Sequence, residues 1–243
     1  MPNTLETLMQ HRSIRTFLPD PVPADDLRAA VAAGQTASTS SAVQAYCALR
    51  ITGAETRAAI AELTGPQEKV RLAPEFLVIC GDTRRHRLAA QRDGNTYDTR
   101  LEAFLVAAID ASLFAEKMVI ALESMGYGIC YIGGLRNNLP EVDRLLNLPE
   151  GIYPLYGLCI GRPAQDPGTR PRLPVDSVLF DDAYPDDDAS LAMLASYDAI
   201  YERYLKERGT EPKKWSAIMG AKYQTAARAG LAAYYAGKGA RLD

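Results

Sequence analysis

The sequence predicts a fold that combines helices and strands, of the α+β or α/β class. Residues 75–81, EFLVICG, form an apolar run of strand length, which is typical of a buried strand. Residues 100–126 repeat apolar side chains at spacings of three and four, which is typical of a long helix. The chain of 243 residues is 47% hydrophobic, which is enough to bury a substantial core. We therefore expect one large domain, or one domain with an extension.

Shorter elements precede the buried strand. The apolar spacing of residues 5–9 predicts a short helix, and residues 25–34 predict another, with acidic residues in the first turn and a glycine at the end. Residues 36–44, TASTSSAVQ, form a polar loop rich in hydroxyl groups. Residues 46–52 alternate as a strand does, and residues 54–64 resemble a helix that Gly-Pro ends.

The middle of the chain continues the alternation of helices and strands. We expect the long helix at 100–126 to be central and nearly buried, because it is apolar on much of its surface. Residues 128–134, GICYIGG, predict a strand that enters a turn. A short helix is expected at 139–147 and a buried strand at 153–161. The basic and polar residues 84–100 predict a surface lid or a loop followed by a helix.

The composition changes after residue 180. Aspartates open a polar, tyrosine-rich tail, in which helices are expected at 190–206 and 217–236, joined by the basic loop 208–214, RGTEPKK. The tail has few large aliphatic residues. It is therefore expected to pack on the main body or on a partner subunit.

Several classes of protein are disfavoured by composition and by missing motifs. A net charge of −3 argues against nucleic-acid binding, and no apolar run is long enough to span a membrane. The first residues lack the apolar core of a signal peptide, so a cytoplasmic protein is expected. The four cysteines have no metal-type spacing and suggest buried free thiols, and two histidines exclude a His-rich metal site. The fingerprints of Rossmann, P-loop, serine-hydrolase and zinc-protease sites are absent.

Three segments carry arginines or glycines that suit an anion or a flat ligand. They are HRSIRTF at 11–17, YIGGLRNN at 131–138 and GRPAQDPGTRPRLP at 161–174. Arg170 and Arg172 are two residues apart between prolines, so in an extended chain both point to one side and suit a phosphate. Taken singly, the arginine pair is also typical of a solvated loop, and the glycine pair of a simple turn.

Together with the serine-rich loop that ends in Gln44 and the TGPQ turn that contains Gln67, these segments resemble one family. The chain is similar over its whole length to the flavin-dependent nitroreductases, specifically the NADPH-preferring, oxygen-insensitive nitroreductase and flavin reductase branch. The resemblance implies an α+β sandwich with a mixed, mainly antiparallel sheet surrounded by helices. It implies a single domain over 1–243, with a core at about 1–178 and a helical extension at about 179–243 that wraps a partner subunit. It also implies a homodimer with the helix at 100–126 in its interface.

The resemblance implies that the anion is the phosphate of FMN. Arg15 is expected near the N1/O2 edge of the flavin ring, Gln67 near its pyrimidine side, and the glycine pair where side chains would block the ring. Arg170 and Arg172 are expected to hold the phosphate. The full set of expected FMN-binding residues is His11, Arg12, Ser13, Arg15, Thr39, Gln67, Tyr131, Ile132, Gly133, Gly134, Arg170 and Arg172.

The same resemblance implies the reaction. NADPH passes a hydride to FMN and leaves, and a nitroaromatic, quinone or free flavin then takes two electrons at the same place, which gives ping-pong kinetics. The redox chemistry belongs to the flavin, so neither a catalytic triad nor a metal is expected. The extra phosphate of NADPH is expected on basic residues of the C-terminal part, namely Arg208, Lys213, Lys214 and Arg228. Ser41 and Ala42 are expected in the acceptor pocket, which the small Ala42 widens.

Two alternatives stay open at this point. One is a flavoenzyme of the same fold that acts on azo, chromate or halogenated substrates. The other is a non-enzymatic flavin carrier or sensor. The sequence names neither the physiological acceptor nor a partner enzyme that receives reduced flavin.

Overall fold

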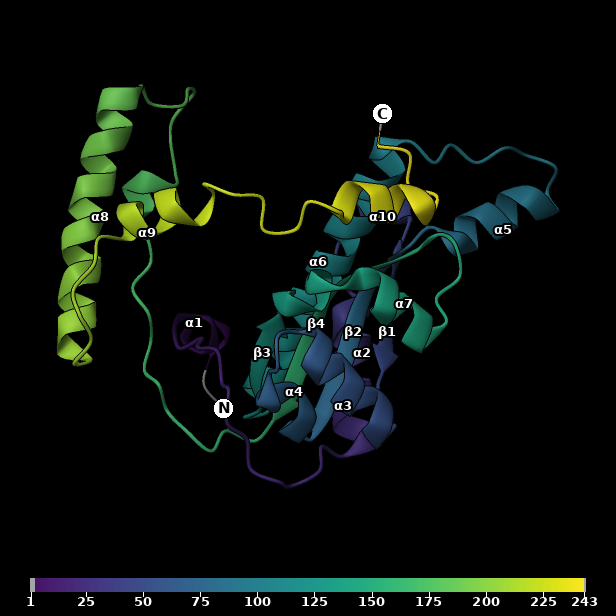
Figure 1. The fold of residues 1–243 in the computed structure, drawn as a ribbon, viewed down its shortest axis with the longest axis horizontal. Helices are drawn as coiled ribbons and strands as arrows, with labels where there is room; N and C mark the ends of the chain where they lie inside the picture. Colours follow the sequence, from purple (N-terminus) through teal and green to yellow (C-terminus); the bar gives the residue numbers. More distant parts are fainter. Residues whose placement is uncertain (1–2, 243) are drawn as a thin grey trace. The chain divides into compact units, whose positions relative to one another are not determined.

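The computed structural model describes residues 3–242, which form two compact units (Figure 1). The first unit contains the chain up to residue 167 together with the residues from 228 onwards, and the second contains residues 168–227. The chain therefore leaves the first unit and later returns to it. The expected division into a core at 1–178 and an extension stays a prediction.

A four-stranded sheet forms the centre of the first unit. Its strands are β1 (Tyr46–Arg50), β2 (Glu75–Asp82), β3 (Gly128–Ile132) and β4 (Ile152–Gly161), in the order β1-β2-β4-β3. All pairings between these strands are antiparallel, which confirms the mainly antiparallel sheet. Strand β2 is buried at every position, as its continuous apolar run predicted.

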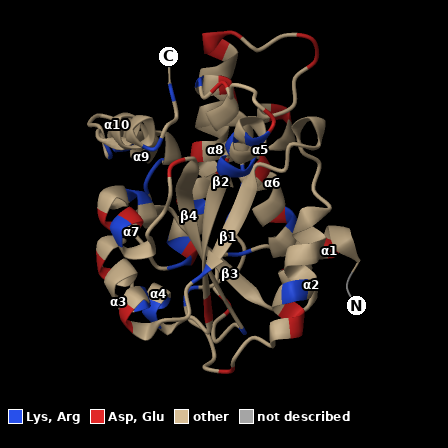
Figure 2. Cartoon of the chain, turned by 90° about the vertical axis from the view of Figure 1, so that its right-hand side faces the viewer, with Lys and Arg blue, Asp and Glu red and all other residues tan. Residues whose placement is uncertain are grey.

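Helices cover both faces of the sheet (Figure 2). Buried residues of α2 (Ala24–Gln35) and α6 (Leu101–Ser124) pack in one core. Those of α3 (Ala54–Leu63), α4 (Glu68–Leu72) and α7 (Leu139–Leu146) pack in the other. The remaining helical elements of this unit are α1 (Thr4–Met9), η1 (Ser40–Ala42), α5 (Arg84–Arg92), η2 (Gly133–Asn137) and α10 (Leu231–Gly237).

The long helix α6 is central but buried on one face only, so the expectation that it is nearly buried was wrong for the single chain. Its buried face places Ala111, Phe114 and Met118 against the sheet. A second row of apolar side chains on α6 is exposed, consisting of Leu101, Leu105, Ile109 and Leu113. Exposed apolar rows of this kind are typical of interaction surfaces.

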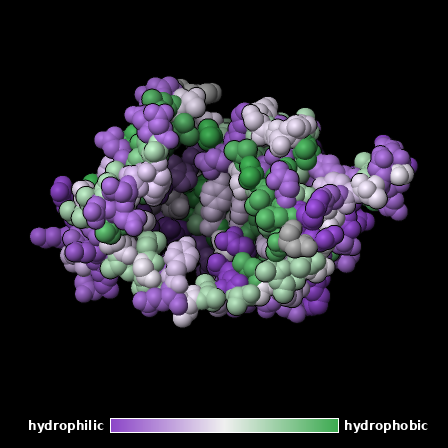
Figure 3. Space-filling model, turned by 90° about the horizontal axis from the view of Figure 1, so that it is seen from above, coloured by the Kyte–Doolittle hydropathy of each residue, from purple (hydrophilic) through white to green (hydrophobic). Residues whose placement is uncertain are grey.

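Helix α5 occupies the segment that the sequence analysis assigned to the surface. It has no buried residue and carries four arginines, and hydrophilic side chains cover the corresponding right-hand end of the molecule (Figure 3). Arg85 pairs with Asp82, and Arg87 pairs with Glu150. Among residues 3–242, no helix combines the length and the apolar character that a membrane crossing requires.

The second unit contains η3 (Val175–Ser177), α8 (Asp187–Glu207) and α9 (Trp215–Lys222). Trp215 meets the Tyr197 ring at 5.5 Å between centroids, and the Asp198 carboxylate accepts hydrogen bonds from the backbone and hydroxyl of Ser216. These contacts hold α9 to α8. The predicted helix at 217–236 was wrong, because α9 ends at Lys222 and α10 belongs to the first unit. Residues 223–227 bury no side chain, and helices in proteins depend largely on packing an apolar face.

Candidate functional site

The segment 11–15 is fixed between α6 and β3. Ile14 is buried, and its N–H donates to the Ile129 carbonyl at 2.8 Å. The His11 Nδ1 atom lies 2.8 Å from the Glu123 carboxylate on α6. The side chain of Arg15 is exposed. The packing of Ile14 therefore positions the predicted cationic side chains along β3 without burying that of Arg15.

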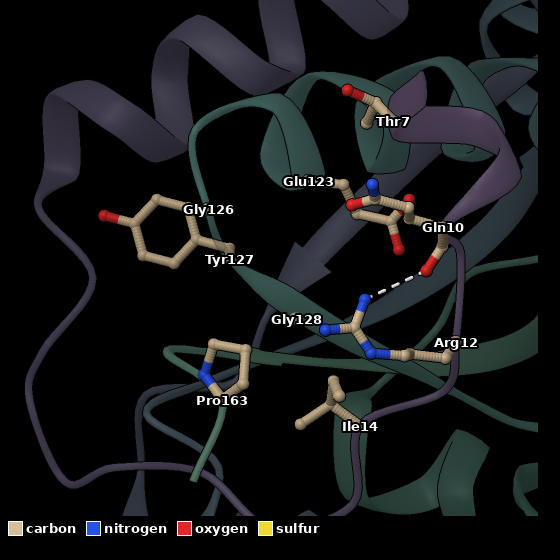
Figure 4. A pocket seen from close by; sticks show the side chains of 9 residues that line it. All are labelled: Thr7, Gln10, Arg12, Ile14, Glu123, Gly126, Tyr127, Gly128 and Pro163. Carbon is tan, nitrogen blue, oxygen red and sulfur yellow. Dashed lines mark hydrogen bonds between the residues drawn. The ribbon is translucent and has the colours of Figure 1, made fainter. Parts of the chain in front are cut away.

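A cavity of about 210 Å³ opens beside this segment (Figure 4). The Arg12 guanidinium extends into it, between Gln10 on one side and Ile14 and Pro163 on the other. Its Nη1 donates to the Gln10 carbonyl at 2.9 Å, and its Nε donates to Asp166 at 2.6 Å. Asp166 is largely exposed, and ion pairs at the surface contribute at most about 1 kcal/mol. The Arg12–Asp166 ion pair therefore contributes little to stability by itself.

The loop 39–44 has a strained backbone that a buried carboxylate holds. Ser41, Ala42 and Gln44 have φ of 46°, 56° and 52°, in the left-handed region that residues with a Cβ rarely adopt. The Asp110 carboxylate on α6 accepts the Ser40 N–H at 3.3 Å and the Ala45 N–H at 3.0 Å. Such strain persists only where surrounding contacts impose it, and Asp110 supplies them from both ends of the loop.

Asp110 was not identified from the sequence. Its side chain is 1% exposed. The sequence pattern that could have revealed it is a single acidic residue on the apolar face of an alanine-rich helix. Asp110 and Glu123 lie on the same helix, whose rise of about 1.5 Å per residue separates them by roughly 20 Å. Within one chain, the structure therefore does not bring Thr39, Ser41 and Ala42 together with the segment 11–15.

Gln67 and Gly134 are brought side by side. The Gln67 amide donates to the Thr64 carbonyl at 2.6 Å, and a Cβ added to Gly134 would collide with both groups. A Cβ added to Gly133 would meet only Arg136, at 3.5 Å. Gly134 is therefore required by the close approach of the Thr64 carbonyl and of Gln67, and only Gly133 leaves open space where a side chain would lie.

Tyr131 and Ile132 differ in what they can offer a ligand. The Tyr131 hydroxyl lies 2.9 Å from the Glu116 carboxylate, and its ring meets Tyr156 edge-on at 5.4 Å. Burial and the nearby Glu116 raise the pKa of Tyr131 above its ordinary value, so it stays protonated. The Ile132 side chain is buried in the core, which leaves only its backbone to line a site.

The second unit brings two of the predicted phosphate-binding arginines to one tyrosine. Arg170 donates to the Tyr204 hydroxyl, which raises the pKa of Arg170, and the Arg208 guanidinium lies 5.5 Å from the centroid of the same ring. Lys213 pairs with Glu211 at 3.1 Å. Arg172 and Lys214 are exposed. The sequence analysis did not identify Tyr204, which contacts both arginines.

Arg228 belongs to the first unit. Its Nε donates to the Asn137 side chain at 3.0 Å, and the Asn137 amide donates to the Thr64 carbonyl at 3.3 Å. Arg228 is therefore linked to the carbonyl that Gln67 also contacts.

The comparisons with known proteins identify the family of the chain. Residues 8–162 match the model of the nitroreductase family, and residues 170–243 match that of its C-terminal domain. The chain is 40% identical over 222 residues to an FMN reductase (NADPH) from Bacillus subtilis, with 89% of each chain covered. It is 37% identical over 241 residues to an NADPH-flavin oxidoreductase from Vibrio harveyi, with 98% of each covered. The solved structure of the NfrA1 nitroreductase from B. subtilis superposes with a TM-score of 0.92 at 37% identity, with 98% of each chain covered. The chain belongs to the nitroreductase family.

Proposed function

We propose that the protein is an FMN-dependent oxidoreductase that takes electrons from NADPH and reduces nitroaromatic, quinone or free flavin acceptors in a ping-pong reaction. The observation that carries the proposal is the open backbone at Gly133, where an added Cβ would meet only Arg136 at 3.5 Å, at the end of a strand along which Arg12 and Arg15 lie. Names of relatives support it, because those at 40% and 37% identity are called NADPH-dependent flavin reductases.

The residues at this place fit FMN. A planar ring needs close approach of the backbone, which Gly133 allows, and a side-chain amide such as that of Gln67, which lies beside Gly134, can bond the polar edge of the ring. When bound, FMN supplies the redox chemistry of the reaction. Arg15 places a cation near the ring, and Arg12 exchanges Asp166 for the phosphate. Arg170 and Arg172, which belong to the second unit, are proposed as phosphate-binding residues on the resemblance to the family alone.

We propose that the two groups of flavin residues meet across the interface of a homodimer. Leu105, Ile109 and Leu113 form an exposed apolar row on α6, which a second copy of the chain would cover. The loop 39–44 of one protomer would then reach the segment 11–15 of the other. The chain from about 179 would embrace the partner as an extension of a single domain.

Binding of NADPH is assigned to Arg208, Lys213, Lys214 and Arg228. Arg208 is exposed and its guanidinium lies over the Tyr204 ring, and a guanidinium suits the extra phosphate of this nucleotide. Ser41 and Ala42 line the acceptor pocket. We further propose a cytoplasmic location, which the four unpaired cysteines support because thiols stay reduced there.

The visible spectrum of the purified protein tests the proposal under anaerobic conditions. The absorption band of oxidised flavin is expected before NADPH is added and is expected to disappear at once afterwards. NADH serves as the matched donor and should reduce the flavin more slowly. A band that persists with NADPH would support a flavin carrier or sensor. A protein without the band that also fails to take up FMN would exclude the flavin site.

A further inference from the structure

The four cysteines lie in two pairs, each directly across two antiparallel strands. Cys47 of β1 opposes Cys80 of β2, and Cys130 of β3 opposes Cys159 of β4. All four are free thiols, and all belong to or border the core under α3, α4 and α7. Their scattered positions in the sequence gave no sign of this pairing, which depends on strand register.

The spacing of Cys47 and Cys80 suits a disulfide. The Ile51 N–H donates to the Phe76 carbonyl, so the alternation of an antiparallel ladder makes the Cys47–Cys80 pair a hydrogen-bonded one as well. The Cα atoms of such a pair are about 5.5 Å apart, which lies within the roughly 4.4–6.8 Å that disulfides span. The Cβ atoms of such a pair are about 5.5 Å apart and those of a disulfide roughly 3.5–4.5 Å, so joining the sulfur atoms also requires the edge strand β1 to move by about 1 Å toward β2.

The two thiols of this pair are not equivalent. Cys47 lies on the edge strand and is partly exposed, whereas Cys80 is completely buried. The neighbouring Cys80 thiol lowers the pKa of Cys47, and the same neighbour together with burial raises the pKa of Cys80, whose thiol donates to the Val78 carbonyl at 3.9 Å. Arg85 also favours the Cys47 thiolate, and Asp82 opposes it. Cys47 is thus the reachable nucleophile, and Cys80 is a protonated thiol held against it.

The second pair also joins an edge strand to an inner strand, but it has no partly exposed member and no thiol whose pKa is lowered. Cys130 and Cys159 are both buried, and burial raises the pKa of both thiols. Cys130 donates to the Tyr131 carbonyl at 3.6 Å, and Cys159 donates to the Lys69 carbonyl at 3.4 Å. Neither sulfur is a reachable thiolate. The second pair therefore provides an internal control with the same cross-strand placement.

We propose that Cys47 and Cys80 form an oxidation site that reduces hydroperoxides and closes to a disulfide. The Cys47 thiolate attacks one peroxide oxygen, the O–O bond breaks, and the departing oxygen takes a proton to leave as water or an alcohol. The Cys80 sulfur then attacks the sulfenic sulfur of Cys47, the S–S bond forms, and the S–O bond breaks. The departing hydroxide takes the Cys80 proton as water. The two thiols supply the two electrons that the hydroperoxide gains, and an external dithiol then reduces the Cys47–Cys80 disulfide by thiol–disulfide exchange and is itself oxidised to a disulfide.

Thiol counting and peptide mapping test this site in the flavin-loaded protein. The reduced protein is treated with a small excess of hydrogen peroxide, alkylated, and mapped by mass spectrometry without reduction. The expected result is loss of two of the four thiols, a cross-linked peptide that contains Cys47 and Cys80, and recovery of the thiols with dithiothreitol. Retention of all four thiols, a Cys130–Cys159 cross-link or a disulfide between two chains would each overturn the proposal.

Variants separate the roles of the two sulfur atoms. Cys80→Ser should stop the reaction at a sulfenic acid on Cys47, which dimedone traps, and Cys47→Ser should keep its three thiols under the same treatment. Cys130→Ser is the matched control and should still form the Cys47–Cys80 link. A sulfenic acid on Cys80 in the Cys47→Ser variant would contradict the assignment. The absence of a sulfenic acid from Cys47 in the Cys80→Ser variant would also contradict it. The wild-type mapping decides the question where a variant does not fold.

Discussion

The loop 39–44 and the segment 11–15 both carry predicted flavin residues, and both are held by carboxylates of α6, but they are held in different ways. Segment 11–15 has no residue with positive φ, and the backbone bond from Ile14 to Ile129 supports it independently of Glu123. The loop has three left-handed residues and depends on Asp110 at both ends. The comparison teaches that a loop with left-handed residues needs hydrogen bonds from a buried carboxylate. A segment beside a strand needs only a backbone hydrogen bond to that strand.

Of the changes considered, separation of the two protomers should lower the FMN affinity most, because the loop 39–44 and the segment 11–15 are proposed to meet across the dimer interface. Ile109 is 55% exposed on α6, and Ile109→Glu would place an unpaired carboxylate in the proposed interface. The dimer is expected to dissociate, and FMN affinity is expected to fall by more than about 100-fold. Analytical ultracentrifugation and flavin titration measure the two effects. Leu88→Glu on α5, where Leu88 is 50% exposed, is the control and should change neither. A monomeric Ile109→Glu protein with unchanged FMN affinity would place the whole site within one chain.

Removal of the loop's anchor should have the next largest effect. Asp110→Ala leaves the Ser40 and Ala45 N–H groups without their acceptor, which costs about 1.5–3 kcal/mol and releases the left-handed residues. FMN affinity is expected to fall by about tenfold to 100-fold in a fluorescence titration. Glu102→Ala, an exposed acidic position in the first turn of the same helix, should leave it unchanged. Equal affinities of the two variants would show that Asp110 does not position the loop.

The end of β3, along which segment 11–15 lies, can be examined with matched glycine variants. Gly134→Ala forces a Cβ against the Thr64 carbonyl and the Gln67 amide, and overpacking of this kind costs about 1–3 kcal/mol. Gly133→Ala adds the same methyl group where the nearest atom is 3.5 Å away and should change the free energy of unfolding by less than about 1 kcal/mol. Urea unfolding of the flavin-free protein measures both. Two equal losses would mean that the Thr64 backbone and Gln67 both move aside for the new side chain.

The smallest effect is expected at the contact that holds segment 11–15 to α6. Glu123→Gln keeps a hydrogen-bonding partner for His11, and the Ile14 backbone bond still locates the segment. FMN affinity should fall by less than about fivefold in the same titration. A larger loss than in Asp110→Ala would reverse the comparison between the two regions.

The parts of the fold that the sequence predicted are those in which one local pattern determines the outcome. The strands predicted at 75–81 and 153–161 match Glu75–Asp82 and Ile152–Gly161, because strands buried on both faces are continuously apolar. The five-residue helix α4 was not predicted, since it contains too little periodicity to recognise. The helix predicted at 217–236 failed for lack of a buried face between Lys222 and Leu231.

The sequence predicted the individual segments of the candidate site but not the contacts between them. The approach of Gln67 to Gly134, the anchoring of the loop by Asp110 and the opposition of Cys47 and Cys80 all join residues distant in the chain. Their meeting depends on strand register and helix placement, which no local pattern contains. Arg170 and Arg172 lie in the second unit, so their expected role at the flavin phosphate stays a prediction.

The return of the chain to the first unit has a consequence for biosynthesis. Tyr235 of α10 packs its ring against Phe104 and Tyr153, and buried Lys238 bonds the Asp143 side chain and the Leu148 carbonyl. These contacts join residues more than 80 positions apart, so they cannot form on the ribosome until residues 228–242 have emerged. During translation of the second unit, the nascent first unit therefore lacks α10, and the part of its core that α10 covers stays exposed.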